Sequence, residues 1–399
     1  MSDVTSNPLY PSLSDSSSLL DGPTDLSHSW FSLYSLSEPR SLATYFSSLT
    51  AQTINTLPYV GIVEMTFSQV FYAHLWTPDR ARSVREWLGD PLIHAVERIP
   101  FRKFKASLPW LSLCCSPDVL WDCLCAELLF SLFSIMDDAL DEKETRYGRQ
   151  TSYGRFGKKR SMHSWDAACK VGRKGKRLLQ EDPIRIGLWQ ATLDQIDQSE
   201  KTRVEQDIHL PFSEYCRQSI RRTSFLGIWW EQGARNAGDT LLAEFIHSIY
   251  PLCAQAAQLK NDLRNADSVW ETNCRGIPFS DFTDGRATAV TILVREKASA
   301  TDYAWIQKHA WKQNLPLSKE TIERLQAICQ NSGVFDAVRT AIISTISNIE
   351  YLITNSSLSL SIKSLWLGWV LEQFSEGILT YQPSSEEFVN TARMLAGAR

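Results

Sequence analysis

Apolar residues recur at helical spacing along most of the chain. From Trp30 onward, apolar positions three and four residues apart dominate, and the strict alternation of a half-buried strand is scarce. Most prolines fall at the ends of these segments, where helices begin or stop. The pattern predicts helices at 41–55, 58–75, 79–97, 117–139, 163–180, 186–203, 212–236, 239–268, 286–297, 318–330, 334–355, 358–376 and 384–397.

These segments predict one large helical domain. Residues 1–27 are polar and rich in serine, and we expect them to be disordered. Residues 28–399 then form a single all-α domain, in which 28–98 is a helical N-terminal extension and antiparallel helices enclose a central cavity. Pro251 lies inside the pattern of 239–268 and predicts a break or kink there.

The composition is that of a soluble globular protein, since 43% of the 399 residues are hydrophobic and 22% are charged. A net charge of −4 gives no electrostatic reason to expect nucleic acid as a partner. The N-terminus lacks the features of a signal peptide, and no apolar run is long enough to cross a bilayer. Nine cysteines without a CxxC pair indicate buried free thiols. We therefore expect a cytoplasmic protein without a membrane anchor.

An acidic cluster follows the apolar segment 117–139. Asp137 and Asp141 are four residues apart and share a helix face, with Asp138 beside them. Mg²⁺ prefers carboxylate oxygens and keeps several waters while it bridges to substrate phosphates. The cluster predicts either half of a metal–diphosphate clamp or a solvated acidic helix end.

A second stretch, AQLKNDLRN, repeats this arrangement of oxygen donors. Asn261, Asp262 and Asn265 follow an apolar run and fall together near the end of a predicted helix. Two such rims facing each other across a cavity predict a site for two or three Mg²⁺ ions. The pair of rims favours the clamp over the acidic helix end.

Arginines occur where a diphosphate would need them. Arginine suits bidentate recognition of phosphate, although each of these side chains alone is typical of a protein surface. With the two acidic rims, they favour a diphosphate site formed with Arg146, Arg222, Arg275 and Arg286. The basic stretch 146–161 is predicted to be a lid over that site or a solvated loop, and beyond Arg146 we favour the loop.

Residues from about 100 to 300 resemble the trans-isoprenyl diphosphate synthase family, and most closely the fungal geranylgeranyl diphosphate synthases. DDALDEKETRYGRQTSYGRFG resembles the first aspartate-rich motif, and RRTSFL resembles the Lys-Thr segment with Arg222 in place of lysine. QLKNDLRN, followed by RGIPFSDFTDGRAT, resembles the second motif, and PFRKFK resembles the element that holds the second substrate. The resemblance implies an all-α class I terpenoid synthase bundle.

The resemblance also implies roles for individual residues, together with a homodimer and a prenyl diphosphate substrate of C10–C20. The implied metal ligands are Asp137, Asp138, Asp141, Asn261, Asp262 and Asn265. The implied catalytic residues are Asp137, Asp138, Arg146, Arg222 and Asp262. The implied substrate-binding residues are Arg102, Lys105, Phe130, Phe133, Tyr147, Thr223, Gln258, Trp229, Arg275 and Arg286.

The departures from the family pattern concentrate on the ligands of isopentenyl diphosphate. Arg102 and Lys105 preserve charge, but Phe130 replaces a histidine and Tyr147 replaces an arginine. Each charge-assisted hydrogen bond lost from such a site is worth roughly 1.5–3 kcal/mol. The sequence therefore predicts that ionisation of the allylic substrate is kept while elongation is weakened.

The chain is rich in tryptophan, with 14 of these residues. Cation–π contacts stabilise a desolvated cation by about 2 kcal/mol, so Trp229, Trp230 and Phe130 are candidates for lining a cavity, although ordinary core packing is the interpretation that we favour for each of them. Phe133 resembles the residue that limits product length in the family. Val269 stands where dedicated cyclases carry a glutamate, which indicates a synthase scaffold put to another use.

Four functions follow from these observations. The first is a Mg²⁺-dependent terpene synthase-like enzyme that ionises a short prenyl diphosphate and cyclises or quenches the cation. The second transfers the cation to a small acceptor such as an amine or an aromatic ring. The third is ordinary chain elongation, and the fourth is a regulatory partner of an active synthase, against which the near-intact first motif argues.

Restoring the two missing ligands tests the weakened elongation site. The double variant Phe130→His, Tyr147→Arg is expected to incorporate isopentenyl diphosphate faster than the wild-type chain, because it regains a donor and a cation for the diphosphate. Radiolabelled isopentenyl diphosphate measures the incorporation. An unchanged rate in the double variant would show that these two positions do not limit elongation.

Overall fold

A computed structural model of the chain describes residues 76–97, 117–146, 149–205, 208–266, 278–313, 317–359, 362–363, 366–367 and 369–370. The helices predicted at 41–55, 58–75 and 384–397 lie outside these residues. So do the predicted disordered segment 1–27 and most of the predicted N-terminal extension.

The described part of the chain is almost entirely helical, and its one sheet is a small antiparallel hairpin in which β1 pairs with β2. In chain order the elements are α4 (Pro78–Leu88), α5 (Asp90–Glu97), α7 (Pro117–Leu140), β1 (Thr145–Arg146), β2 (Arg149–Gln150), α8 (Ser152–Cys169), α9 (Arg173–Leu178), α10 (Pro183–Glu205), α11 (Phe212–Thr223), α12 (Phe225–Asn236), α13 (Thr240–Asn265), α15 (Ser280–Thr283), α16 (Ala289–Lys297), α17 (Ala300–His309), α18 (Lys319–Asn331) and α19 (Val334–Asn355). The prediction of an all-α fold is confirmed.

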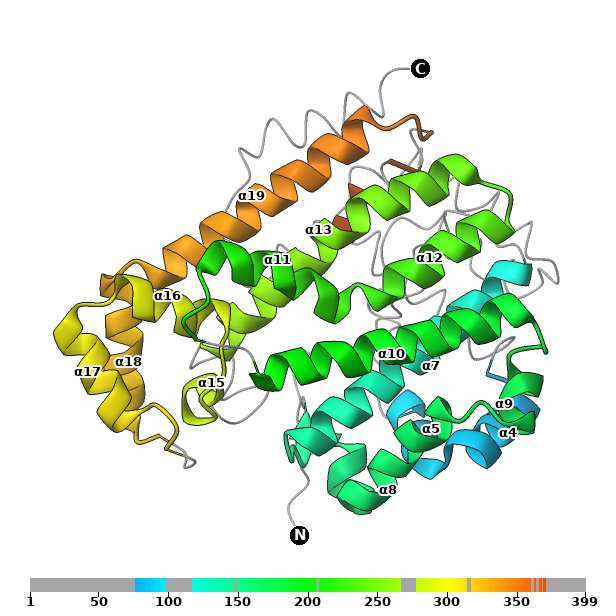
Figure 1. The fold of residues 1–399 in the computed structure, drawn as a ribbon, viewed down its shortest axis with the longest axis horizontal. Coiled ribbons are helices and arrows are strands. Elements are labelled where there is room, and N and C mark those ends of the chain that lie inside the picture. The colour runs from blue at the N-terminus through cyan, green and yellow to red at the C-terminus, as the bar shows by residue number, and fades with distance from the viewer. Residues whose placement is uncertain are drawn as a thin grey trace, which may run out of the picture.

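Long helices lie side by side through the middle of the molecule (Figure 1). α13 packs against α11, α12 and α19, and α7 packs against α8 and α12. α7 is apolar almost all round, and its buried leucines and alanines place it in the interior. The shorter helices α4, α5, α8 and α9 cover one side of the bundle, and α15–α18 gather at the end where α13 stops.

The core has two hydrophobic clusters, and α13 and α19 run through both. The larger cluster joins α7, α10 and α12 to the first part of α13, including Tyr250 and Cys253. The smaller cluster joins α11 and α16–α18 to the last part of α13, including Leu259 and Leu263. The first part of α13 therefore packs in the larger cluster, and its last part, which contains the polar residues of the second motif, packs beside the smaller one.

Local sequence signals explain where several helices begin and end. The segment predicted at 79–97 is divided into α4 and α5 at Gly89, whose φ of 83° suits glycine. α16 begins at a capping box between Thr288 and Thr291. Of the break or kink predicted at Pro251, the break is wrong, because α13 continues through this proline.

Glycine permits a close approach of α12 and α13. A Cβ atom on Gly227 would lie 2.0 Å from Cδ1 of Tyr250, which no packing tolerates. The absent side chain therefore lets the Tyr250 ring lie against the α12 backbone. This contact joins the two helices that flank the aromatic cluster of Trp230, Trp366 and Trp369.

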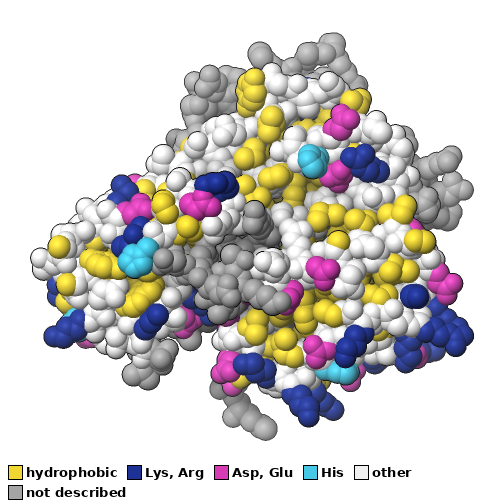
Figure 2. Space-filling model, viewed as in Figure 1, with side chains coloured by type: hydrophobic (Ala, Val, Ile, Leu, Met, Phe, Trp, Pro, Cys, Tyr) yellow, Lys and Arg dark blue, Asp and Glu magenta, His cyan; other side chains and the backbone are white. Residues whose placement is uncertain are grey.

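The basic stretch after the acidic cluster is not the predicted loop. From Ser152 onward it forms α8, and the residues before it form the β1–β2 hairpin. The side chains of Lys158, Lys159 and Arg160 are exposed, and Figure 2 shows Lys and Arg side chains along the edge of the molecule formed by α4, α8 and α9. The structure also contains α17, in a stretch between 297 and 318 where the sequence pattern predicted no helix.

The cysteines in the described ranges, Cys123, Cys125, Cys169, Cys216, Cys253 and Cys329, are free thiols, as predicted. Burial raises the pKa of Cys216 to about 11 and that of Cys329 to about 12, so neither is a reactive thiolate at neutral pH. Among the helices of the described chain, none is both long enough and apolar enough to span a bilayer.

A buried ion pair joins three helices at the end of the bundle away from the acidic cluster. Nε of Arg185 on α10 donates to Oδ1 of Asp122 on α7 at 2.9 Å, and Nδ2 of Asn236 on α12 donates to Oδ2 at 2.8 Å. Both charged side chains are almost completely buried. Removing one partner leaves an uncompensated buried charge, which is costly.

Asp122→Ala is therefore expected to lower the free energy of unfolding by about 3 kcal/mol, because Arg185 loses its buried carboxylate partner while Gln180 and the more exposed Asp182 remain. Urea denaturation measures the change, and Asp79→Ala, in an exposed ion pair with Arg82, is the control. Combining Asp122→Ala with Arg185→Met should cost less than the two single changes together. Equal losses for Asp122→Ala and the control would contradict this role of the pair.

Candidate functional site

The first acidic cluster lies where α7 ends. The backbone amide of Asp141 donates to the carbonyl of Asp137 at 2.9 Å, and that of Lys143 donates to the carbonyl of Asp138 at 2.9 Å. The chain leaves the helix through Glu142, whose φ is 53°. Asp137 is half-buried and Asp138 is buried. Asp141 therefore lies one helical turn beyond Asp137, as predicted, while Asp138 beside them is buried.

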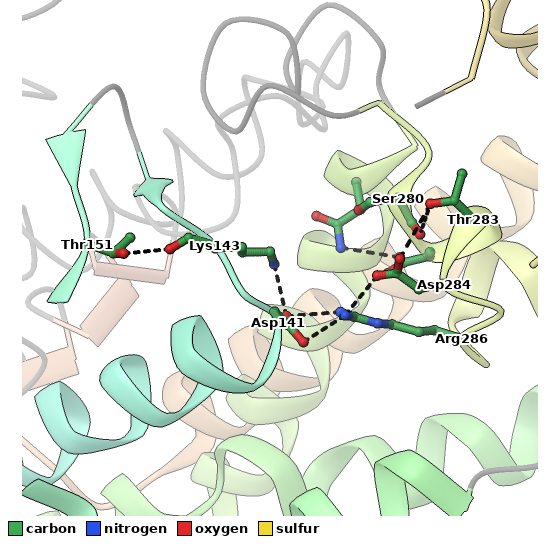
Figure 3. A network of polar contacts seen from close by, with 9 residues as sticks. Asp141, Lys143, Thr151, Ser280, Thr283, Asp284 and Arg286 are labelled. Carbon is green, nitrogen blue, oxygen red and sulfur yellow. Dashed lines mark hydrogen bonds and ion pairs between the residues drawn. The ribbon is translucent and has the colours of Figure 1, made fainter. Parts of the chain in front are cut away.

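Asp141 forms the centre of a polar network (Figure 3). Its carboxylate accepts two hydrogen bonds from Arg286, with Nη2–Oδ1 at 2.7 Å and Nη1–Oδ2 at 3.0 Å. Nζ of Lys143 donates to Oδ2 at 3.0 Å, and the Asp141 side chain is only 4% exposed. The bidentate contact joins residues 145 positions apart in the sequence.

Arg286 lies between the first acidic cluster and a second group of carboxylates that follows α13. Nη2 of Arg286 is 2.8 Å from Oδ2 of Asp284, and its backbone amide donates to the carbonyl of Asp281 at 2.8 Å. Burial lowers the pKa of the Arg286 guanidinium, but Asp141, Asp281 and Asp284 raise it further, so that its pKa is above the ordinary value. The arginine is a permanent cation held among three carboxylates.

The second motif reaches the same network from the end of α13. Nδ2 of Asn265 donates to Oδ2 of Asp281 at 3.2 Å, and the carbonyl of Asn265 accepts a hydrogen bond from the amide of Phe279. Asn261 lies one turn earlier and is half-buried. The two oxygen-rich helix ends are therefore connected indirectly: Asn265 binds Asp281, and Arg286 binds both Asp281 and Asp141.

Asp262 does not face this network. Its side chain is 1% exposed, and its carboxylate accepts hydrogen bonds from Gln258 Nε2 at 2.7 Å, from the amide of Ala289 at 3.0 Å and from the Tyr215 hydroxyl. These donors reach both oxygens and come from α11, α13 and α16. The prediction that Asp262 is a metal ligand conflicts with this geometry, because a ligand oxygen must reach the ion.

Two predicted substrate-binding residues belong to the interior. Gln258 is buried and directs its amide to Asp262. Trp229 is buried, and its indole Nε1 donates to Oγ1 of Thr192 on α10 at 2.9 Å. The Gln258 contact lies within α13, whereas the Trp229 contact joins α12 to α10, so core packing describes Trp229.

Two aromatic side chains of α7 lie just before the acidic cluster. Phe130 and Phe133 are half-buried and pack against the larger hydrophobic cluster. The Phe133 ring centroid is 5.5 Å from that of Phe225, the first residue of α12. The Phe133 ring therefore packs against a second aromatic ring and lies one turn before Asp137. Its role in limiting product length stays a prediction.

The remaining predicted residues are placed only in part. Arg146 lies in β1, and Arg222 and Thr223 lie in the last turn of α11. The predicted residues Arg102, Lys105, Tyr147 and Arg275 lie outside the described residues.

The donor chemistry suits a hard cation, although no ion-binding cluster is assembled. Within the described ranges, no group of three or more His, Cys, Asp or Glu side chains is arranged to hold an ion. The reason is that Asp141 is turned to Arg286 and Asp138 is buried. Carboxylate and amide oxygens are the ligands that Mg²⁺ takes, and Asp141, Asp281 and Asp284 outnumber the cations Lys143 and Arg286. The residues fit a divalent cation in kind and in charge.

Comparison with solved structures identifies the architecture. A decaprenyl diphosphate synthase from Rhodobacter capsulatus is 15% identical, with a TM-score of 0.63 over 77% of this chain and 98% of that chain. A polyprenyl synthase from Caulobacter crescentus, solved with calcium and isoprenyl diphosphate, is 15% identical, with a TM-score of 0.62 over 81% and 97% of the two chains. A geranylgeranyl pyrophosphate synthase is 18% identical, with a TM-score of 0.60 over 81% and 98%.

This is the fold of the prenyl diphosphate synthases. The class I terpenoid synthase bundle expected from the sequence motifs is thereby confirmed. No protein-family model matches the sequence, and no curated protein matches it.

Sequence reasoning missed four polar residues of this prenyl synthase fold. Lys143, Asp281 and Asp284 belong to the network around Arg286, and Tyr215 binds Asp262. The sequence SDFTDGR did contain a signal, because two acids three positions apart before an arginine can converge on it at the end of a short helix. Tyr215 carried no such signal.

The contact between Asp141 and Arg286 is tested by a double-mutant cycle. Arg286→Met and Asp141→Asn are each expected to lower the free energy of unfolding by about 1–3 kcal/mol, because each leaves a largely buried charge with fewer partners. The double variant should lose less than the sum. Arg339→Met, in an exposed pair with Asp336, is the matched control. Additive losses measured by urea denaturation would show that the two side chains do not interact.

Proposed function

We propose that the chain is an enzyme that uses prenyl diphosphates and ionises an allylic diphosphate at the network around Arg286. One observation carries the proposal: Asp141 of the first acidic motif and Arg286 of the last basic motif meet in a bidentate contact. In a fold shared with prenyl diphosphate synthases, this contact supports a single diphosphate site built from both motifs.

The residues that would hold Mg²⁺ are Asp137 in the last turn of α7, Asp141 directly after it, and Asn261 and Asn265 on α13. When bound, Mg²⁺ neutralises charge on the diphosphate and makes it a better leaving group. Arg286 is placed to exchange its carboxylate partner for a phosphate oxygen, since the guanidinium binds either in the same bidentate way. The diphosphate thus takes over the role that Asp141 has in the ligand-free network.

The chemical step is heterolysis of the allylic carbon–oxygen bond. The electron pair leaves with the diphosphate, and the prenyl group becomes an allylic cation. Phe130 and Phe133 lie within two turns of Asp137, where an aromatic face stabilises a desolvated cation by about 2 kcal/mol. Capture by one of the substrate's own double bonds with loss of a proton gives a cyclic hydrocarbon, and capture by water gives an alcohol.

We favour cyclisation or quenching because Phe130 and Tyr147 replace polar ligands of isopentenyl diphosphate. Chain elongation is the second candidate, since the structural neighbours are synthases of geranylgeranyl, decaprenyl and polyprenyl diphosphates. Transfer to a small amine or aromatic acceptor uses the same cation. A homodimer and a cytoplasmic location stay predictions.

The proposal predicts release of inorganic diphosphate when the full chain is incubated with Mg²⁺ and geranyl, farnesyl or geranylgeranyl diphosphate. Release without any other substrate, with a hydrocarbon or alcohol product in gas chromatography, supports cyclisation or quenching. Release that requires isopentenyl diphosphate supports elongation, and release that requires an amine or aromatic acceptor supports transfer. No release with any of these substrates would exclude all three reactions.

Asp137→Asn is the variant for this assay, because it removes a half-buried carboxylate at the end of α7 while it keeps the side-chain volume. Loss of about 3 kcal/mol of transition-state stabilisation corresponds to a rate at least a hundred-fold lower. Asp166→Asn, on the exposed face of α8, is the control and should keep the wild-type rate.

A further inference from the structure

Asp262 is a buried carboxylate for which the chemical step has no use. It accepts hydrogen bonds from the Tyr215 hydroxyl on α11, the Gln258 amide one turn earlier in α13 and the backbone amide of Ala289, the first residue of α16. The Tyr215 side chain is itself 1% exposed. Three helices therefore converge on one anion.

The three donors in these contacts are an amide side chain, a hydroxyl and a backbone amide. A buried carboxylate is costly unless it is fully hydrogen-bonded, and the amino end of a helix provides favourable partial charge. At the start of α16 the hydroxyl of Thr288 accepts from the amide of Thr291, which leaves the Ala289 amide to donate to Asp262. The α16 terminus is thus capped by its own threonine and by a carboxylate from α13.

The contacts of Asp262 fix how α13 is rotated about its axis. Successive residues of an α-helix are about 100° apart, so Asn261 and Asn265 lie about 40° from each other and to one side of Asp262. On that side Asn265 reaches Asp281 of the network around Arg286. With Asp262 bound to α11 and α16, both asparagines are presented to the network.

We propose that Asp262 is a positioning residue, which acts with Tyr215 to orient Asn261 and Asn265 and does not touch the ion. The inference rests on the proposed function, because it assumes that the network binds a divalent cation with diphosphate. It assigns different roles to adjacent residues of one motif: Asn261 faces the ligand, and Asp262 holds the helix.

Tyr215→Phe is the decisive variant, because it removes one hydrogen bond to Asp262 and leaves every candidate ligand in place. Tyr351→Phe, on an exposed side chain of α19, is the matched control. Mn²⁺ binding by the full chain is measured by electron paramagnetic resonance in the presence of inorganic diphosphate. One neutral hydrogen bond is worth about 1 kcal/mol, so we expect Mn²⁺ affinity to fall about five-fold in Tyr215→Phe and to stay unchanged in the control.

Asp262→Asn completes a double-mutant cycle with Tyr215→Phe. If Asp262 acts through Tyr215, the double variant binds Mn²⁺ about as weakly as Asp262→Asn alone. Hydrogen exchange provides a readout that is independent of the ion. Asp262→Asn weakens the acceptor of the Ala289 amide, and Tyr215→Phe leaves that acceptor less firmly held, so this amide should exchange faster in both single variants. Tyr215→Phe keeps the test decisive even where Asp262→Asn folds poorly.

The results that would overturn the inference are distinct from those that would overturn the proposed function. Wild-type Mn²⁺ affinity in Tyr215→Phe, with binding lost in Asp262→Asn, would make Asp262 a direct ligand. Wild-type affinity in both variants would remove any role in metal binding. Absence of Mn²⁺ binding by the wild-type chain with diphosphate would overturn the proposed function, and the positioning role with it.

Discussion

The contact between Asp141 and Arg286 is the interaction on which the site depends. It is bidentate, largely buried and formed between residues 145 positions apart, so it exists only if the whole bundle is folded. A guanidinium that binds a carboxylate in this way can bind a phosphate in the same way. The Asp141 carboxylate thus lies where the proposed substrate would place its own anion.

The fold presents the ends of two long helices to this contact. α7 is held in the larger hydrophobic cluster and ends at Asp137–Leu140, and α13 runs through both clusters before it ends at Asn265. Asp262 then binds α11 and α16, so the last turn of α13 is fixed from two directions. Rigid helices supply the oxygen donors, and the turn between α15 and α16 supplies the cation. This arrangement suits the proposed site, in which the Arg286 guanidinium exchanges the Asp141 carboxylate for a phosphate oxygen.

The sequence predicted the helical class, most long helices and the motifs that contain Asp141 and Arg286. These features depend on periodicity and charge spacing among residues that are close in the sequence. It could not predict that Asp262 is turned away from Asn261 and Asn265, since the direction depends on Tyr215 from another helix. Nor could it place Trp229, whose partner Thr192 lies 37 residues away. The uninterrupted helix at Pro251 and the helical start at Ser152 were not predicted, since the first is held in both hydrophobic clusters and the second by a hydrogen bond from the Ser152 hydroxyl to the carbonyl of Pro91 on α5.

Coupled binding of diphosphate and metal tests the central claim most directly, because that claim is that both motifs form one site. Calorimetric titration of the full chain with inorganic diphosphate, with and without Mg²⁺, measures the coupling. The account predicts that Mg²⁺ strengthens diphosphate binding at least ten-fold, which corresponds to about 1.4 kcal/mol of coupling free energy. Equal affinity in both titrations, or no binding in either, would contradict it.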